Sequence, residues 1–209
     1  LPDKDPMAAA ADFPAPKIVD LRRMRGPDLD AVLAEEVDYW REHFHWDFRP
    51  AADLVKRFVS TQSLAGYALV HGSAVVGYLY TVAEDRKIVI GGLFIQKAFR
   101  SVDAEGLLIE AAIAEALRSP SLKRIESQLM TLSLPMNRPY PYSQWLSICE
   151  RFYMEAPLPR LVNWPLPDRN TPAVFERWMP DAQPEAASLI ARAYHGHVDA
   201  DINEQYRTP

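Results

Sequence analysis

The chain has a single cysteine, Cys149, no apolar run of membrane-spanning length and no cluster of basic residues. One cysteine excludes an internal disulfide, and no spacing of Cys and His is of the zinc-binding kind. No transmembrane segment or signal peptide is recognisable in the sequence. The net charge of −5 argues against nucleic acid and anionic membranes as partners. We therefore expect a cytoplasmic protein without a metal site.

Apolar residues make up 48% of the chain, which is enough for a sizeable core in one domain. The sequence predicts a disordered lead-in over residues 1–16, in which Met7 is a candidate natural start. Residues 17–168 are predicted to form the folded domain. We interpret residues 169–209 either as the start of a second, similar domain or as an extension that packs back on the first. We expect the natural chain to continue beyond Pro209.

A proline-rich linker is predicted over residues 157–172. Beyond it, residues 174–179 resemble a strand, and residues 183–194 have one apolar helical face. A helix this short is marginal in water unless its apolar face is covered. A linker rich in proline is semi-rigid and extended, which favours contact of the following segment with a neighbouring copy over packing on its own chain. The sequence therefore predicts self-association of the chain through residues 174–209.

Hydrophobic periodicity predicts the alternating strands and helices of an α/β fold. A predicted hairpin turns at Gly72, and Leu54, Phe58 and Val59 are predicted to face the core from the second helix. The predicted strands cover residues 17–21, 64–71, 74–83, 87–95 and 124–132, and a further strand starts at 152–154. The predicted helices cover residues 26–44, 51–61, 107–117 and 144–151.

The stretch from Lys87 to Leu117 organises the rest of the chain. It opens with a β-branched and aromatic run typical of a strand, turns through residues 96–106, and ends in a helix that is apolar almost all round. A strand that turns sharply into a buried helix directs the first N–H groups of that helix, and the positive end of its dipole, at one point. Such a point suits an anion such as a pyrophosphate.

Residues 93–109 resemble the core motif of the GNAT N-acetyltransferases, which reads roughly L-Y-V-x-x-x-Y-R-G-x-G-x-G-x-x-L-L. The apolar positions fit, as do Phe99 and Arg100. The glycines of the motif are replaced, by Ser101, Asp103 and Glu105. The resemblance covers residues 17–166 and implies the GNAT fold, a mixed central sheet with helices on both faces in the order β-α-α-β-β-β-α-β-α-β.

The same resemblance implies acetyl-CoA as the cofactor, bound where the fourth and fifth strands separate. Backbone groups of the fourth strand would hold the pantetheine arm, at Leu93, Phe94 and Ile95. The turn would hold the pyrophosphate, through Arg100, Ser101, Val102, Asp103, Ala104, Glu105 and Gly106. Gly91 and Gly92 either allow the cofactor to approach the strand closely or relieve crowding against the helix.

Two acidic side chains in this turn weigh against a pyrophosphate. At ~4 Å, a carboxylate that opposes a phosphate charge costs about 1 kcal/mol in water and about 4 kcal/mol at an effective dielectric of about 20. Asp103 is also predicted to cap the helix and so to accept from the N–H groups that a phosphate needs. Arg100 offers one compensating charge.

GNAT enzymes often use a tyrosine in a Y-x-x-x-G-F pattern as the general acid. In this chain Ser147 stands at the tyrosine position and Arg151 at the glycine position. A serine hydroxyl is too weak an acid for that role. Tyr140 and Tyr142 lie just upstream, either as substitutes for the acid or as ordinary loop residues.

Other candidate residues have simpler interpretations beside their functional ones. His43 and His45 are either a general base or structural members of an aromatic cluster. Cys149 is predicted to be inert and buried. The alternating His and Asp residues from His195 to Asp201 have a metal-like spacing, and we interpret them as a solvated loop.

Two functions remain open. The first is acyl-CoA-dependent N-acyl transfer, in which an amine attacks the thioester and backbone N–H groups stabilise the oxyanion. The acceptor would be a small-molecule or peptide amine. The second is a catalytically inactive GNAT-like domain with a structural or ligand-binding role.

Overall fold

The computed structural model describes residues 15–132, 141–161 and 176–206. The chain divides into two compact units, of which unit 1 ends at Leu146 and unit 2 begins at Ser147. The predicted boundary at residue 168 lies among residues outside the described ranges and stays a prediction.

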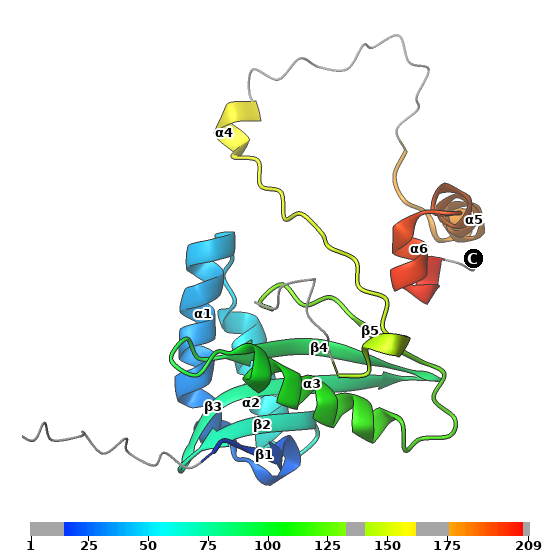
Figure 1. Cartoon of the computed structure of the whole chain (residues 1–209). Helices are drawn as coiled ribbons and strands as arrows, with labels where there is room; N and C mark the ends of the chain where they lie inside the picture. Colours follow the sequence, from blue (N-terminus) through cyan, green and yellow to red (C-terminus); the bar gives the residue numbers. More distant parts are fainter. Residues whose placement is uncertain (1–14, 133–140, 162–175, 207–209) are drawn as a thin grey trace, which may run out of the picture. The chain divides into compact units, whose positions relative to one another are not determined.

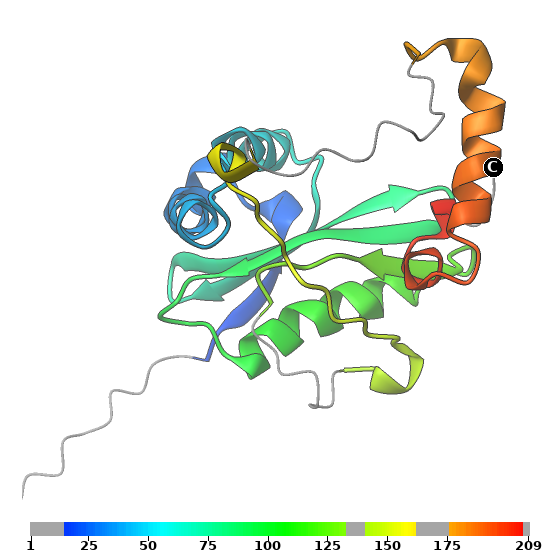
Figure 2. The same cartoon turned by 90° about the horizontal axis from the view of Figure 1, so that it is seen from above.

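Unit 1 is a five-stranded mixed sheet with helices on both faces (Figures 1 and 2). The strands lie in sequence order, antiparallel except for the parallel pair of β4 and β5. They are β1 (Lys17–Asp20), β2 (Ala65–His71), β3 (Ala74–Glu84), β4 (Lys87–Ile95) and β5 (Arg124–Ser127). The predicted α/β class and mixed sheet are therefore confirmed, as is the hairpin turn at Gly72, whose φ is 61°.

One face of the sheet is covered by α1 (Asp30–Phe44) and α2 (Arg49–Ser60), which follow the 3-10 turns η1 (Leu21–Arg23) and η2 (Gly26–Leu29). From α2, the residues buried against this face are Ala52, Val55 and Val59. The prediction that Leu54 and Phe58 point inward is wrong, because each side chain is 41% exposed. The i, i+3, i+7 row that is buried consists of smaller side chains, which allow α2 to pack closely.

The other face is covered by α3 (Val102–Ala116), which buries Leu108, Ile109, Ala112 and Ile113 against the sheet. This helix begins five residues before the predicted start at residue 107. The acidic first turn hid its beginning, because charged residues interrupt the apolar run there.

β5 ends at Ser127, whereas the sequence predicted a strand to Leu132. Its pairing with β4 runs only from Lys87 opposite Arg124 to Ile90 opposite Ser127. Lys87 binds Glu126 at 3.0 Å and Arg124 binds it at 2.7 Å, so an ion-pair cluster fixes the start of both strands. Beyond Ile90 the two strands part.

Unit 2 contains α5 (Gln183–Ala193), which confirms the predicted helix over residues 183–194. The helix predicted over residues 144–151 is absent, and only the 3-10 turn η3 (Ser143–Trp145) of unit 1 occurs there. The segments 152–154 and 176–179 are not strands, while residues 174 and 175 lie outside the described ranges. The remaining elements of unit 2 are α4 (Leu158–Leu161), η4 (Pro180–Ala182), α6 (Val198–Ile202) and η5 (Glu204–Tyr206).

Gly66 in β2 has a backbone conformation and a close approach to β3 that leave no room for a side chain. Its φ is +142°, and a Cβ atom there would lie 2.2 Å from the Leu79 carbonyl oxygen and 2.7 Å from Tyr80 Cα. We expect Gly66→Ala to lower the free energy of unfolding by about 2 kcal/mol or more, because backbone atoms cannot yield locally. The control Gly72→Ala also has a positive φ but open space around it, and it should cost only about 1 kcal/mol. Urea unfolding of both variants checks this, and equal losses would contradict it.

Candidate functional site

The opening between β4 and β5 begins at a bulge beside Gly91 and Gly92. The ring of Tyr80, on β3, lies against both glycines. A Cβ atom would meet it at 2.2 Å on Gly91 and at 2.8 Å on Gly92. The two glycines therefore make room for an aromatic ring of the neighbouring strand. Neither alternative raised from the sequence named this ring as the neighbour.

Three carbonyl groups of β4 accept hydrogen bonds from side chains of this chain at its parting edge. The Ser127 hydroxyl donates to the Ile90 carbonyl at 3.2 Å. The Thr131 hydroxyl, which is buried, donates to the Leu93 carbonyl. The strand thus meets its own need for donors where the sequence predicted a pantetheine arm.

The third acceptor is the Ile95 carbonyl, to which Arg100 donates through Nε at 3.1 Å and Nη2 at 3.0 Å. The guanidinium also lies 4.9 Å from the ring centre of Tyr39 and 5.1 Å from that of Phe94. Arg100 therefore points toward α1 and β4. Its role as a compensating charge for a pyrophosphate stays a prediction.

The turn between β4 and α3 is tied to α1. Glu35 accepts from the backbone N–H of Lys97 at 2.5 Å, and the Gln96 side chain donates to the Ala31 carbonyl at 3.4 Å. These contacts span more than 60 positions of sequence. They fix the path by which the chain enters α3.

Ser101 is the N-cap of α3, and its hydroxyl accepts from the backbone N–H of Ala104 at 3.1 Å. The prediction that Asp103 is the cap is therefore wrong, since Asp103 already lies within the first turn. Glu105 also lies in this turn and is 1% exposed. Two carboxylates of the chain itself thus stand at the positive end of the α3 dipole, where negative charge is favourable.

A buried carboxyl group, Glu36 of α1, lies on the opposite face of the sheet from α3. It is 4% exposed. Tyr78 donates its hydroxyl to Glu36 Oε2 at 2.5 Å, and the Trp40 indole donates to Oε1 at 3.3 Å. Burial raises the pKa of Glu36 to about 7, while these two hydrogen bonds and the Arg100 charge act in the opposite direction.

Two tyrosine side chains connect the Glu36 carboxyl to the bulge in β4. Tyr78 and Tyr80 are neighbours on the same face of β3, with parallel rings 6.4 Å apart. Burial and the nearby Glu36 charge raise the pKa of Tyr80. A titratable cluster of Glu36, Tyr78 and Tyr80 therefore lies next to the bulge in β4.

Solved structures with a similar chain include three acetyltransferases, while no family model and no curated protein matches. A possible acetyltransferase from Clostridium difficile 630 is 14% identical, with a TM-score of 0.46, over 69% of this chain and 98% of its own. A GNAT-family acetyltransferase from Streptococcus pneumoniae TIGR4 is 14% identical, with a TM-score of 0.42, over 68% and 98%. The ribosomal-protein-alanine N-acetyltransferase from Brucella melitensis biovar Abortus 2308 is 14% identical, with a TM-score of 0.41, over 66% and 98%.

The topology of unit 1 decides the fold. Two helices follow β1, three antiparallel strands follow them, and α3 connects β4 to a parallel β5 that parts from it at a bulge. The chain has the GNAT fold.

The residues of this chain do not fit an acyl-CoA held in the manner that the GNAT resemblance implies. The Leu93 carbonyl is taken by Thr131 and the Ile95 carbonyl by Arg100. At the α3 terminus, the cap hydroxyl of Ser101 occupies the N–H of Ala104, and Glu105 places a buried carboxylate in the first turn. Both halves of the expected cradle are engaged within the chain.

Apart from Tyr140, the candidate acid and base residues raised from the sequence lie within the described residues. His43 is exposed, stacks on Tyr39 and contacts the Tyr39 carbonyl at 3.0 Å, and His45 ends α1 with a φ of 49°. Ser147 lies in unit 2 and Tyr140 lies outside the described residues. Tyr142, at the end of the loop, stacks on Trp145.

The His and Asp residues from His195 to Asp201 lie in the described part of unit 2. The stretch from His195 is not a loop throughout, because His197 caps the short helix α6 and Asp199 pairs with Arg151. Within the described ranges, no three His, Cys, Asp or Glu side chains are grouped as metal ligands, and no helix could cross a membrane. Cys149 is half-buried in an irregular segment.

Sequence reasoning missed Glu36, although a signal was present. It falls in the apolar stripe of α1 between Leu33 and Trp40, where a charged residue is unexpected. A carboxyl group in such a stripe is buried by its helix and needs donors from the sheet below. Tyr78 supplies one of them.

The raised pKa of Glu36 predicts a pH-dependent stability. Between about pH 4.5 and 7 the folded chain holds a proton that the unfolded chain releases, so the free energy of unfolding falls as pH rises through this window. The total loss is roughly 3 kcal/mol. We expect Glu36→Gln to abolish this fall and to be at least as stable as the wild type at pH 8. Urea unfolding at pH 5 and pH 8 measures it.

The control for this experiment is Glu42→Gln, which removes an exposed carboxyl group from the same helix. It should leave the pH dependence of the wild type in place. A Glu36→Gln variant whose stability still falls between pH 5 and pH 8 by the wild-type amount would contradict the assignment.

Proposed function

We propose that unit 1 is a non-catalytic GNAT domain, which keeps the fold for ligand binding or assembly and does not load acyl-CoA. The observation that carries this proposal is the closed terminus of α3, where Ser101 caps the helix and Glu105 is buried in its first turn. A pyrophosphate would have to displace the cap and stand beside two carboxylates. Each opposing charge at ~4 Å costs about 1 kcal/mol in water and about 4 kcal/mol at an effective dielectric of about 20.

The bonded edge of β4 supports the same proposal independently. An incoming amide arm must break the bond from Thr131 to the Leu93 carbonyl before it can pair there. Thr131 is buried, and its hydroxyl would lose its partner at a cost of about 1–3 kcal/mol.

A second candidate is acyl-CoA-dependent N-acyl transfer to a small-molecule or peptide amine, and Glu36 favours it. A carboxyl group with a pKa near 7 is suited to take a proton from an ammonium group at neutral pH. Glu36 also lies near the bulge in β4, where β4 and β5 part. Against this candidate, Glu36 is only 4% exposed and its carboxyl group is bound by Tyr78, so a substrate amine cannot reach it in this conformation.

Calorimetry with acetyl-CoA separates the two candidates. We expect no binding to the wild-type chain at millimolar cofactor. The combined variant Ser101→Gly, Asp103→Gly, Glu105→Gly and Thr131→Val should gain binding, because it frees the helix terminus and the Leu93 carbonyl. The variant Asp103→Asn with Glu105→Gln is the control that removes charge and keeps the side chains. Circular dichroism checks folding, since the glycines at positions 103 and 105 each cost the helix about 1 kcal/mol.

Submillimolar binding by the wild type would contradict the non-catalytic proposal. If that binding came with transfer of the acetyl group to amines, and if Glu36→Gln removed the transfer, the second candidate would replace the first. If the combined variant folds and still does not bind, the closed turn and edge are not what prevents binding.

The assembly role that we propose involves residues 174–209. Two large side chains of α5 are exposed within unit 2, Leu189 and Ile190. We expect the chain to self-associate through this segment, because an exposed apolar helix face is favourably covered. When residues 174–209 are deleted, light scattering should show that the mass per particle falls by more than the mass of the deleted segment, because the subunits separate. A monomer before and after the deletion would contradict it.

A further inference from the structure

Unit 1 has a cavity at the opposite end of α3 from Ser101. Its volume is about 190 Å³, equal to about six water volumes in the liquid. It lies between the C-terminal half of α3 and the sheet. Its floor is made by small and apolar residues of both layers, Ala65, Gly66, Ala83, Ile88 and Ala112.

The hollow exists because several of the lining positions on the strands are Gly or Ala. Gly66 cannot be replaced by a larger residue, since a Cβ atom would strike the Leu79 carbonyl oxygen. Ala112 faces it from a helix whose next turns pack tightly through Ile109 and Ile113. The hollow is thus built into the fold and is distinct from the opening between β4 and β5.

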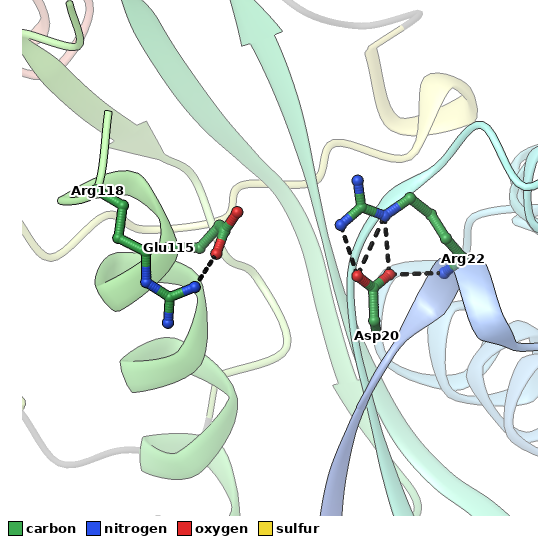
Figure 3. Close-up of polar contacts among 4 residues, drawn as sticks. All are labelled: Asp20, Arg22, Glu115 and Arg118. Atoms are coloured by element: carbon green, nitrogen blue, oxygen red, sulfur yellow. Dashed lines mark hydrogen bonds and ion pairs between the residues drawn. The ribbon is translucent and has the colours of Figure 1, made fainter. Parts of the chain in front are cut away.

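Two ion pairs each contribute one member to the lining of the cavity (Figure 3). Arg22 donates from Nε and Nη2 to both carboxylate oxygens of Asp20 at 2.5–3.2 Å. On α3, Arg118 donates to Glu115 at 2.7 Å. Arg22 and Glu115 both line the cavity, and their side chains are 55% and 50% exposed. Both can therefore turn toward a ligand without leaving a buried charge unpaired.

Tyr67 forms a wall of the cavity between these pairs. Its pKa is raised by burial first and by the Glu115 charge next, while Arg118 and Arg22 act in the opposite direction. Its hydroxyl therefore senses all four charged groups. The lining presents one carboxylate, one guanidinium and a phenol, and an ion-pair partner of opposite charge stands beside each of the two charged groups.

We propose that this cavity binds a small zwitterion with an apolar body, of the class of a free aliphatic α-amino acid. The ammonium group lies beside Glu115 and Tyr67, the carboxylate lies beside Arg22, and the side chain fills the floor. A ligand with one net charge meets an equal number of like charges in this lining, whereas a zwitterion matches both signs. The assignment rests on the proposed ligand-binding role and gives it a site.

The test is an NMR titration of the isotope-labelled chain with free leucine, in which the amide chemical shifts are monitored. We expect saturable shifts at Gly66, Tyr67 and Ala112 at millimolar leucine. Leucinamide lacks the carboxylate, and 4-methylpentanoate lacks the ammonium group. Both should bind at least about tenfold more weakly than leucine. Equal affinity for the three probes, or no shift with any of them, overturns the proposal.

Variants locate the site. Arg22→Gln and Glu115→Gln should each weaken leucine binding by about tenfold, and Ala112→Leu should abolish it by filling the floor. The matched control is Arg41→Gln, which breaks an exposed ion pair with Asp38 on α1 and should leave binding unchanged. Urea unfolding confirms that each variant is folded. Leucine shifts that persist unchanged in all three cavity variants overturn the site.

Failure here is distinguishable from failure of the proposed function. Acetyl-CoA binding would shift amides of residues 93–106, whereas leucine shifts those at the other end of α3. Loss of the leucine response with no acetyl-CoA response leaves the non-catalytic role standing without this ligand.

Discussion

Beyond Ile90, β4 stays paired with β3 but has no partner in β5, so the carbonyl groups of its buried residues on that edge need other donors. This constraint shapes the whole candidate site. In this chain the donors are Thr131 for Leu93 and Arg100 for Ile95. Because Arg100 turns back to the strand, the only charged side chains in the first turn of α3 are acidic, and Ser101 caps that helix.

A strand whose edge is satisfied internally gains stability and loses the capacity to recruit a ligand. The same logic applies at the start of α3, where the chain's own carboxylates occupy the positive end of the dipole. The internal bonds at the β4 edge and at the start of α3 leave the packing on both faces of the sheet intact. Phe94 packs in the core on one face and Leu93 in the core on the other. On the proposal that unit 1 does not load acyl-CoA, the GNAT fold persists without its cofactor site.

Local patterns in the sequence were sufficient for the elements that carry their own signals. The bounds of β4 were predicted from its β-branched run, and the hairpin from Gly72. The cap of α3 was not, because Ser101 and Asp103 are both good N-caps and only the three-dimensional path of the turn selects one. Likewise, no local signal says that β5 stops at Ser127, since the residues that follow it continue to alternate.

Glu36 shows a different limit. Its place in the apolar stripe of α1 could have been noticed, but its partner Tyr78 is 42 positions away and its pKa depends on burial by the sheet. The hollow at the other end of α3 was equally hidden, because it arises from what Gly66 and Ala112 lack.

The central claim is that the chain's own groups close the opening between β4 and β5. A crystal structure determined from crystals grown with millimolar acetyl-CoA tests it most directly. The account predicts that Thr131 still donates to the Leu93 carbonyl, that Ser101 still caps α3, and that no pyrophosphate lies at its terminus. A cofactor seated between the two strands, with Thr131 displaced from Leu93, would contradict the account.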